Sequence, residues 1–223
     1  LLDVGTDNEE LLNDPLYLGC THRRVHGEEF YEIVDEFVKA ATTRWPNVLI
    51  QWEDFTNDKA FPLLNRYRDE VLCFNDDIQG TGAVALAGLF AAMRLRQEHL
   101  SDQRIVFCGA GSAAVGIADM ICAGIADEHS MSTEDARKLV WMADSRGLVT
   151  TQREGKLEAH KLPYARGEGP AATLLDIVKR VKPTILIGAS GHAHTFTEDV
   201  VRTMHRDCES PIIFALSNPT SKA

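Results

Sequence analysis

Two short acidic segments carry residue types that could hold a divalent cation. Glu53 and Asp54 follow the apolar run 47–51, and Asp77 lies in Phe74–Thr81, directly before an alanine-rich segment. Carboxylates beside aromatic residues are costly to bury alone, and a cation relieves that cost. Oxygen-only ligands suit Mg²⁺ or Mn²⁺, and no Cys/His cluster accompanies them, which argues against zinc at this position. In a plainer interpretation, Asp77 caps the following helix and the other two carboxylates face solvent.

A glycine-rich turn at 109–116 could bind the phosphates of a dinucleotide. Gly109 permits a tight turn after the apolar run 105–108, and Gly111 lets a pyrophosphate approach the backbone, where a helix end offers N–H groups. The spacing is GxGxxxxG, with Ala114 at the usual third-glycine position, and the alternative is a strand–helix turn without a ligand. The predicted cofactor-binding residues of this turn are Gly109, Ala110, Gly111, Ser112, Ala113, Ala114 and Gly116.

One acidic residue is placed to meet the ribose of such a dinucleotide. Asp144 ends the apolar run 139–143, the next strand-like segment after the glycine turn. It follows Gly111 by more than the usual 20 or so residues, and the polar insertion 127–132 accounts for the extra length. We therefore predict that Asp144 binds the cofactor.

The elements that must position these residues follow from apolar spacing. Strand-length runs occur at 105–108, 139–143, 184–187 and 212–216, and helical stretches at 112–128, 170–181 and 197–206 separate them. Ser132, with Asp135 three residues later, predicts one more helix start. Alternating strands and helices indicate βαβ units and a parallel sheet. The fold class expected is α/β, a Rossmann-like doubly wound parallel sheet.

Residues before 103 have a different pattern. An amphipathic helix is expected over 26–44, a strand over 47–51, a short helix through Ala60 to Tyr67, and an apolar helix over 80–96. The polar stretch 98–103 marks the expected boundary. We predict a partial, helix-rich substrate- and metal-binding lobe at 1–102 and a dinucleotide-binding domain at 103–223.

Composition excludes several classes of protein. The 223 residues are 44% hydrophobic and 25% charged, with a net charge of −10, so a nucleic-acid partner is not expected. No uninterrupted apolar run reaches the 18 or so residues needed to cross a bilayer, and no signal-like segment opens the chain. Five cysteines without CxxC spacing predict free thiols and a reducing compartment, the cytoplasm or an organellar matrix.

Five segments together resemble malic enzymes, over essentially the whole chain. They are Asp3–Asn8, Leu49–Phe55, Phe74–Thr81, Gly109–Gly111 and Phe214–Thr220. The resemblance implies oxidative decarboxylation of (S)-malate to pyruvate and CO₂, with reduction of NAD(P), by a homodimer or homotetramer. Hydride transfer comes first, then decarboxylation, then protonation of enolpyruvate.

The resemblance also implies roles for single residues. Glu53, Asp54 and Asp77 would be the three protein ligands of Mg²⁺ or Mn²⁺, which chelates malate and stabilises the enolate. Asp76 looks like the family's catalytic aspartate, which supports an acid–base lysine. Two asparagines complete the implied site: Asn57 would contact the cofactor and Asn218 the substrate carboxylate.

In the family, the acid–base tyrosine and lysine belong to segments that come before the point where this chain begins. We therefore expect these 223 residues to be inactive alone. Lys59 is near the metal motif but is interpreted as a solvated lysine rather than a substitute base. His192 and His194, in a loop near the cofactor, are likewise interpreted as solvated.

The residues after Asp144 favour NADP over NAD. A carboxylate at the end of the strand favours a free ribose 2′-hydroxyl, but Ser145 can donate a hydrogen bond and Arg146 adds positive charge. Lys161 lies in a segment that resembles the loop carrying a lysine in NADP-dependent malic enzymes, and a lysine suits phosphate. In the alternative, Lys161 is an ordinary surface lysine.

Two other functions remain compatible with the motifs. A malolactic enzyme shares the fold, the metal and the nicotinamide cofactor but releases lactate. A non-catalytic cofactor-sensing module would need no metal, and the Glu53, Asp54 and Asp77 set argues against it. Product analysis distinguishes a malolactic enzyme, which releases lactate, from a malic enzyme, which releases pyruvate. A Mn²⁺ titration distinguishes a cofactor-sensing module, which needs no metal, from either enzyme.

Overall fold

A computed structural model describes residues 2–153, 155, 157–190 and 194–217, apart from the side chain of Asn57. Contacts divide the chain into two compact units. Unit 1 comprises 1–50 and 68–72, and unit 2 comprises 51–67 and 73–223. The predicted boundary near residue 103 lies inside unit 2, because the helical segment 76–96 packs on the helix at 112–129.

Unit 1 contains two helices. α1 (Glu9–Leu12) begins at Asn8, whose side chain accepts hydrogen bonds from the N–H groups of Glu10 and Leu11. α2 (Gly27–Arg44) turns Phe30, Val34 and Val38 inward at helical spacing, and all three are buried. The amphipathic helix predicted over 26–44 is therefore confirmed.

Unit 2 is built on a five-stranded sheet of order β5-β4-β3-β6-β7. β3 (Ile105–Cys108) pairs in parallel with β4 (Val140–Asp144) on one side and β6 (Ile185–Gly188) on the other. β7 (Ile212–Ala215) pairs in parallel with β6, and the two-residue β5 (Gly147–Leu148) pairs antiparallel with β4. The chain leaves β3 toward one edge and later returns to its other side, so the predicted doubly wound parallel sheet is confirmed.

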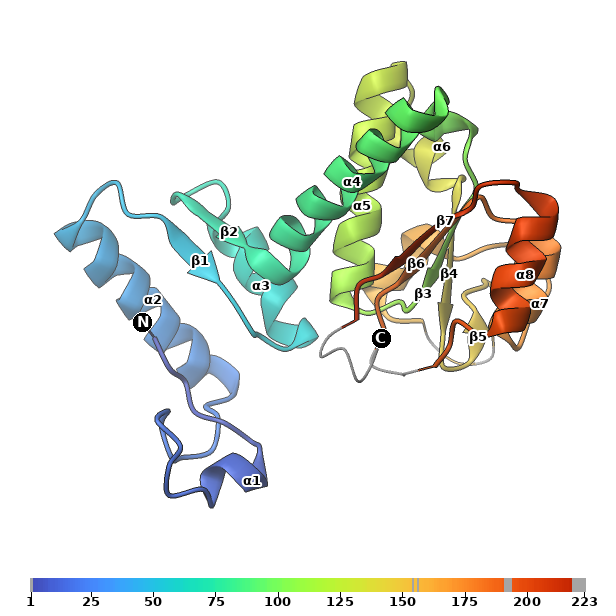
Figure 1. Ribbon diagram of the computed structural model, residues 1–223. Coiled ribbons are helices and arrows are strands. Elements are labelled where there is room, and N and C mark those ends of the chain that lie inside the picture. Colours follow the sequence, from blue (N-terminus) through green and yellow to red (C-terminus); the bar gives the residue numbers. More distant parts are fainter. Residues whose placement is uncertain (1, 154, 156, 191–193, 218–223) are drawn as a thin grey trace. The chain divides into compact units, whose positions relative to one another are not determined.

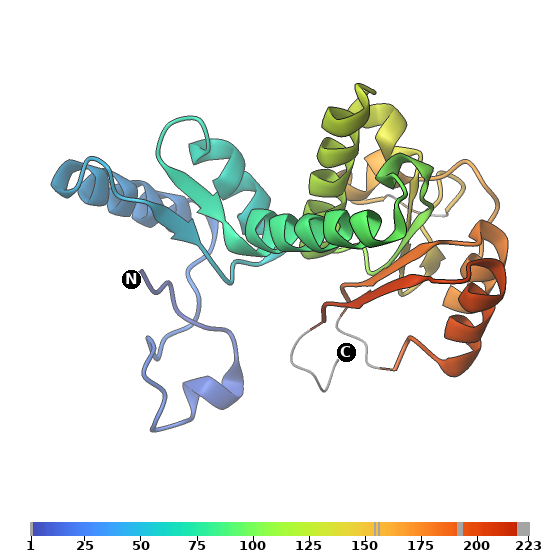
Figure 2. The same cartoon turned by 45° about the horizontal axis from the view of Figure 1, so that its top comes forward.

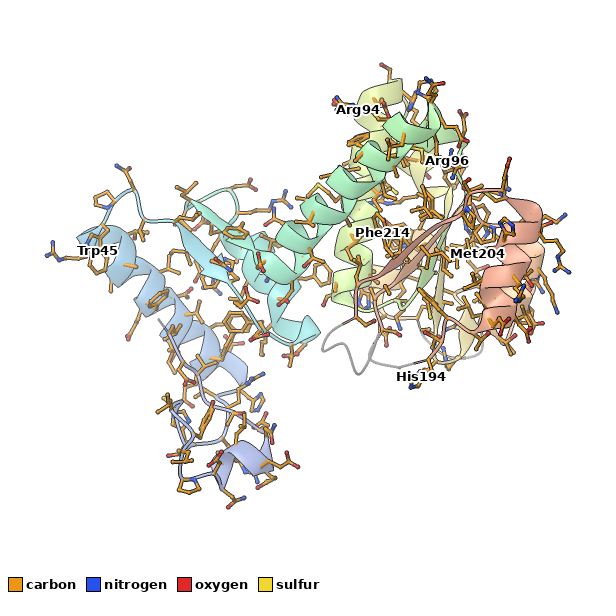
Figure 3. The ribbon with its side chains drawn as sticks, viewed as in Figure 1. Trp45, Arg94, Arg96, His194, Met204 and Phe214 are labelled. Atoms are coloured by element: carbon orange, nitrogen blue, oxygen red, sulfur yellow. The ribbon has the colours of Figure 1, made fainter. Side chains whose placement is uncertain are left out.

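Helices cover both faces of this sheet, as Figures 1 and 2 show. On one face, α5 (Ser112–His129) packs on Ile105 and Phe107 of β3, and α4 (Thr81–Arg96) packs on α5. On the other face, α7 (Leu174–Val181) and α8 (Glu198–Asp207) cover Val106. Met204 of α8 (labelled in Figure 3) is fully buried in that second core. Alternate residues of β3 thus face opposite helical layers, as the pleat requires.

A smaller part of unit 2 precedes this sheet. β1 (Ile50–Trp52), whose first residue is the last of the range 1–50 in unit 1, and β2 (Cys73–Asn75) form a two-stranded sheet, with α3 (Asn57–Tyr67) between them in the sequence. A five-residue π-helical turn, η1 (Asp76–Gly80), then leads into α4. The predicted strand at 47–51 is shifted to Ile50–Trp52.

Several local predictions differ from the structure in their bounds. α6 (Thr133–Arg137) begins after Ser132, whose hydroxyl accepts the Asp135 N–H, as predicted. The helix expected over 170–181 begins only at Leu174, because Thr173 caps it and ends the preceding extended chain. The 3₁₀ segments η2 (Leu100–Asp102) and η3 (Ala159–Tyr164), together with β5, were not predicted, since short elements have no repeating apolar pattern.

The continuous helical segment 76–96 is long and apolar enough to cross a membrane by length and composition alone. The polar residues at its start concealed this in the sequence. Within its most apolar window 28% of the segment is buried, including Leu89 and Met93, which lie in the core shared with α5. The five cysteines are free thiols in the structure.

Candidate functional site

The three predicted metal ligands converge at the end of β1 and the start of η1. Carboxylate oxygens of Glu53, Asp54 and Asp77 lie within 4.8 Å of one another. The Asp54 N–H donates to Asp77 Oδ2 over 3.1 Å, which joins the two segments directly. Asp54 has a φ of 58°, a left-handed conformation that turns the chain sharply after the strand. Segments 23 residues apart thus place three anionic oxygens together.

Asn75 fixes the turn that carries Asp77. It is fully buried, its Oδ1 accepts the Ile78 N–H over 2.8 Å, and its own N–H donates to Gln79 Oε1 over 3.0 Å. The side chain therefore caps the π-helical turn, which is a geometry often found at functional sites. Asp77 does not cap this turn, so the first half of the plainer interpretation is wrong, whereas its second half is confirmed because Glu53 and Asp54 are exposed.

The carboxylates of this cluster repel one another. Burial raises the pKa of Asp77, and the charges of Asp54 and Asp76 raise it further, against the hydrogen bond from the Asp54 N–H. For Glu53, the hydrogen bond from Gln51 lowers the pKa, but burial and the neighbouring carboxylates outweigh it and the pKa is raised. Such a set is stabilised by a positive ion between the oxygens. The residues present fit a hard divalent cation with oxygen ligands.

Asp76, the predicted catalytic aspartate, is half-buried beside this cluster. Its carboxylate packs on the backbone of Gly80, where a side chain would collide with it. Its charge contributes to the raised pKa values of Glu53 and Asp77. Asp76 is thus within electrostatic range of Glu53 and Asp77.

The glycine turn has the geometry expected for a phosphate site. Gly109 has a φ of 126°, and a side chain there would collide with the Ala189 carbonyl after β6. Gly111 is the N-cap of α5 and has no side chain to occupy the first-turn N–H groups. Ala110, Ser112 and Ala114 are buried against the sheet, and Ala113 is half-buried. A helix N-terminus of this kind attracts anions.

Gly116 links the cofactor turn to the metal turn. It lies in the second turn of α5, and a Cβ there would be 2.7 Å from the Ile78 carbonyl oxygen of η1. The predicted cofactor residue Gly116 therefore lies against the backbone of the turn that carries Asp77. Its small size lets the two candidate binding regions approach each other.

Asp144 ends β4 as predicted, and both of its carboxylate oxygens accept hydrogen bonds. Oδ1 accepts the Arg146 N–H over 2.9 Å, while Oδ2 accepts from Arg153 Nη1 over 2.7 Å and from Lys161 Nζ over 3.2 Å. Burial raises the pKa of Asp144, but these donors outweigh it and lower the pKa to about 2. The side chain is therefore ionised at any physiological pH.

A pocket of about 320 Å³ opens beside Asp144. Lys161 lies on its wall, and Lys161 Nζ also pairs with Glu158. The sequence thus singled out Asp144, Ser145 and Lys161 of this pocket, but it did not reveal that Lys161 contacts two carboxylates, those of Asp144 and Glu158. The lining residues are Asp144, Ser145, Arg146, Leu157, Glu158 and Lys161.

Sequence reasoning missed two residues that shape these regions. The Arg153 guanidinium pairs with Asp144 and also donates to the carbonyls of Gly147 and Leu148, and its side chain is only 8% exposed. His160 Nε2 lies 3.2 Å from the Ala110 carbonyl oxygen, and its ring stacks on Phe61. A single arginine or histidine in a loop has no spacing pattern, so no signal in the sequence could have found them.

Some predicted residues cannot be placed. Asn218 and His192 lie outside the described residues, and the side chain of Asn57, the first residue of α3, is also outside them. His194 has a φ of 60° and is exposed (Figure 3), as expected for a solvated loop position. The hydroxyl of Ser217 accepts the Ser190 N–H, which brings the end of β7 next to the loop after β6.

Two family models match the chain. Residues 1–68 match the malic enzyme N-terminal domain, and residues 78–223 match the malic enzyme NAD binding domain. The chain belongs to the malic enzyme family. Glu53 and Asp54 lie near the end of the first matched region, and Asp77 directly precedes the second. This malic enzyme chain therefore places the candidate metal ligands at the junction of the two family domains.

Relatives in bacteria support this assignment. The chain is 50% identical to the NAD-dependent malic enzymes of Proteus mirabilis and Cronobacter sakazakii, over its whole length. It covers 40% and 41% of those proteins, so it spans about two fifths of their length.

Solved structures support the fold. A malic enzyme of Entamoeba histolytica matches 84% of the chain with a TM-score of 0.66 and 25% identity, the match covering 37% of that protein. An NAD-dependent malic enzyme of Thermotoga maritima matches 88% with a TM-score of 0.67 and 23% identity, the match covering 48% of that protein.

Proposed function

We propose that the protein to which this chain belongs oxidatively decarboxylates (S)-malate to pyruvate and CO₂. The observation that carries the proposal is the convergence of Glu53, Asp54 and Asp77 within 4.8 Å, held by Gly116 close to a dinucleotide-type glycine turn. Oxidative decarboxylation of malate needs a hydride acceptor for the oxidation and, beside it, a positive charge for the enolate that loss of CO₂ leaves. The names of the relatives at 50% identity support the same activity.

The chain's own residues have separable parts in this reaction. Glu53, Asp54 and Asp77 would hold Mg²⁺ or Mn²⁺, which supplies positive charge for the malate carboxylate, its hydroxyl and the enolate that decarboxylation leaves. The first turn of α5 binds the dinucleotide phosphates. Asp76 orients an acid–base group through its carboxylate, and Asn57 and Asn218 are proposed contacts of cofactor and substrate.

We propose NAD as the cofactor. The ionised Asp144 carboxylate lines the pocket at the end of β4, where it suits a ribose 2′-hydroxyl and opposes a 2′-phosphate. Lys161, on which the expectation of NADP depended, contacts two carboxylates, Asp144 and Glu158, which compensate its charge. The relatives' names also favour NAD. NADP use stays a prediction that direct assay decides.

The test is an assay of the full-length protein with malate, Mn²⁺ and each nicotinamide cofactor in turn. We expect NAD reduction, with one pyruvate formed for each NADH. Chelation of the metal should abolish turnover, and readdition of Mn²⁺ should restore it.

Three other outcomes are possible, and each would contradict either the proposed reaction or the proposed cofactor. Lactate without net cofactor reduction would show a malolactic enzyme. Dinucleotide binding with neither turnover nor Mn²⁺ binding would show a cofactor-sensing module. A higher kcat/KM with NADP than with NAD would overturn the cofactor assignment and leave the reaction intact.

A further inference from the structure

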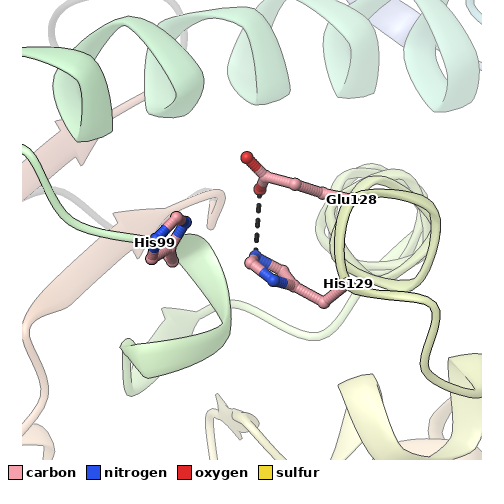
Figure 4. Close-up of side chains that lie close together, drawn as sticks. All are labelled: His99, Glu128 and His129. Atoms are coloured by element: carbon pink, nitrogen blue, oxygen red, sulfur yellow. Dashed lines mark ion pairs between the residues drawn. The ribbon is translucent and has the colours of Figure 1, made fainter.

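A second group of metal-ligating side chains lies at the far end of α5. His99, Glu128 and His129 each offer one ligand atom, and these atoms lie within 4.8 Å of one another (Figure 4). Glu128 and His129 are the last two residues of α5, and His99 lies in the loop that follows α4. None of the motifs in the sequence includes these residues, because 29 positions separate the two sides of the group.

We propose that His99, Glu128 and His129 form a second metal site, which takes a divalent ion of the zinc class. Two imidazoles and a carboxylate are ligands that Zn²⁺ accepts, whereas Mg²⁺ and Mn²⁺ favour oxygen-only sets. Three protein ligands leave a coordination position open for water or another small ligand. The site therefore differs in metal class from the Glu53, Asp54 and Asp77 cluster.

One pair of ligand atoms lies close to the spacing of two ligands on a zinc ion. His129 Nε2 lies 3.2 Å from Glu128 Oε2. Two ligands on one tetrahedral ion, at bond lengths of about 2.0–2.2 Å, are separated by roughly 3.3–3.6 Å, slightly more than this distance. The centroids of the His99 and His129 rings are 5.1 Å apart and the rings meet edge to face at 89°, and one ligand atom of each residue lies within 4.8 Å of the other two.

The pairing of His129 itself calls for a cation. Its Nε2 is inaccessible to solvent and has no aligned hydrogen bond among the described residues, although the Glu128 carboxylate is adjacent. A proton on this nitrogen makes the contact with Glu128 an ion pair, and a metal ion bound to both atoms would take the place of that proton. Glu128 and His129 also lie at the C-terminus of α5, the negative end of the helix dipole, which favours a bound cation.

The backbone at His99 is already fixed, which preorganises the site. The Gln103 side chain donates to the His99 carbonyl over 3.0 Å and to Glu98 Oε2 over 2.9 Å. Leu100, the next residue, is fully buried in the core that contains α5. A metal at this position would tie the loop that leads into β3 to the end of α5.

The second site is remote from the first. α5 has 18 residues and is therefore about 27 Å long. The carboxylate cluster packs near its start through Gly116, and the histidine site is at its end. The two sites can therefore be measured independently.

The experiment titrates metal into the full-length protein carrying Asp77→Ala, which weakens the carboxylate site. Calorimetry with Zn²⁺ should show one equivalent bound in the presence of excess Mg²⁺. Co²⁺ should give the visible absorption of a four-coordinate site without thiolate charge-transfer bands, which excludes the five cysteines as its ligands.

Substitutions then locate the site. We expect each of three substitutions to weaken Zn²⁺ binding at least about tenfold: His129→Ala, His99→Ala and Glu128→Gln. Substitution of a residue that only orients a ligand already lowers metal affinity about 10–100-fold, and loss of a ligand itself should lower it at least as much. The matched control, His205→Ala, removes an exposed histidine of α8 and should leave the affinity unchanged. Glu128→Gln keeps the side-chain shape, so it tests the ligand even where an alanine variant misfolds.

Two results would overturn the proposal. One is no Zn²⁺ equivalent in the presence of excess Mg²⁺, and the other is an equivalent that survives all three substitutions. Neither result bears on malate turnover, because the carboxylate cluster and glycine turn are unaltered in the parent protein.

Discussion

Carboxylates at the two ends of the proposed active region have opposite electrostatic surroundings. At the β1–η1 junction, the charges that shift the pKa of Asp77 are those of Asp54 and Asp76, and both raise it. At the end of β4, Arg153, Lys161 and the Arg146 N–H lower the pKa of Asp144 to about 2. The carboxylates at the β1–η1 junction therefore lack neighbouring positive charges, whereas the charge of Asp144 is balanced by basic side chains of the protein.

This difference separates a metal site from a recognition site. A cluster of carboxylates that repel one another is stabilised when a cation binds, so a metal ion can supply the positive charge that the protein does not provide there. A carboxylate already paired with arginine and lysine gains little from a cation, but holds its oxygens in fixed positions for a ligand hydroxyl. Four predictions test this contrast, from the largest expected effect to the smallest.

Removing one carboxylate from the first region should have the largest effect. In the full-length protein, Asp77→Ala or Glu53→Gln should weaken Mn²⁺ binding by at least about a hundredfold, since even outer-sphere partners contribute 10–100-fold. Calorimetry measures the affinity, and Asp144→Asn is the matched control because it removes a carboxylate from the balanced region. Unchanged Mn²⁺ affinity in both variants would show that these are ordinary surface carboxylates.

Disturbing the contact between the glycine turn and the turn that carries Asp77 should lower stability. Gly116→Ala places a Cβ about 2.7 Å from the Ile78 carbonyl, and backbone cannot move away cheaply. We expect a loss of about 1–3 kcal/mol in the free energy of urea unfolding, together with weaker Mn²⁺ binding. Gly124→Ala, in the same helix, meets the flexible end of Leu86 and the edge of the Phe90 ring rather than backbone, and should be nearly neutral. Equal changes in unfolding free energy and Mn²⁺ affinity for the two variants would show that the Gly116 contact does not couple the glycine turn to the turn that carries Asp77.

The balanced region should contribute stability that depends on pH. The pKa of Asp144 is about 2 in the folded protein, below its ordinary value of 3.8, so its contribution is full above about pH 4 and is lost as pH falls toward 2. The shift corresponds to at most about 2 kcal/mol. The difference in unfolding free energy between the parent and Asp144→Asn should therefore shrink over that same fall in pH. Asp102→Asn, an exposed control, should follow the parent throughout.

The smallest expected effect concerns the cofactor. Lys161→Gln leaves Asp144 paired with Arg153 but removes the positive charge nearest to a 2′-phosphate. We expect the KM for NADP to rise several-fold to about tenfold and the KM for NAD to change little. Steady-state kinetics of the full-length protein with both cofactors measures the ratio. An equal loss with both cofactors would mean that Lys161 only supports the fold.

The sequence by itself determined the regular elements and the residues of the main motifs. The spacing of apolar residues specified α2, α5 and the parallel strands, because a periodic pattern fixes which face is buried. The glycine turn was recognisable because only glycine tolerates the φ of Gly109 and the close approach to Ala189. The acidic segments stood out by composition.

Only the tertiary structure decided how these residues are paired. The partners of Asp144 come from a loop whose basic residues follow no pattern, and Asn75 rather than Asp77 caps the turn before α4. His99 and the end of α5 meet across two elements, so no local spacing could reveal them. Local sequence fixes the conformation of a segment, but charge balance and metal ligation depend on which segments the packed core brings within a few ångströms of one another.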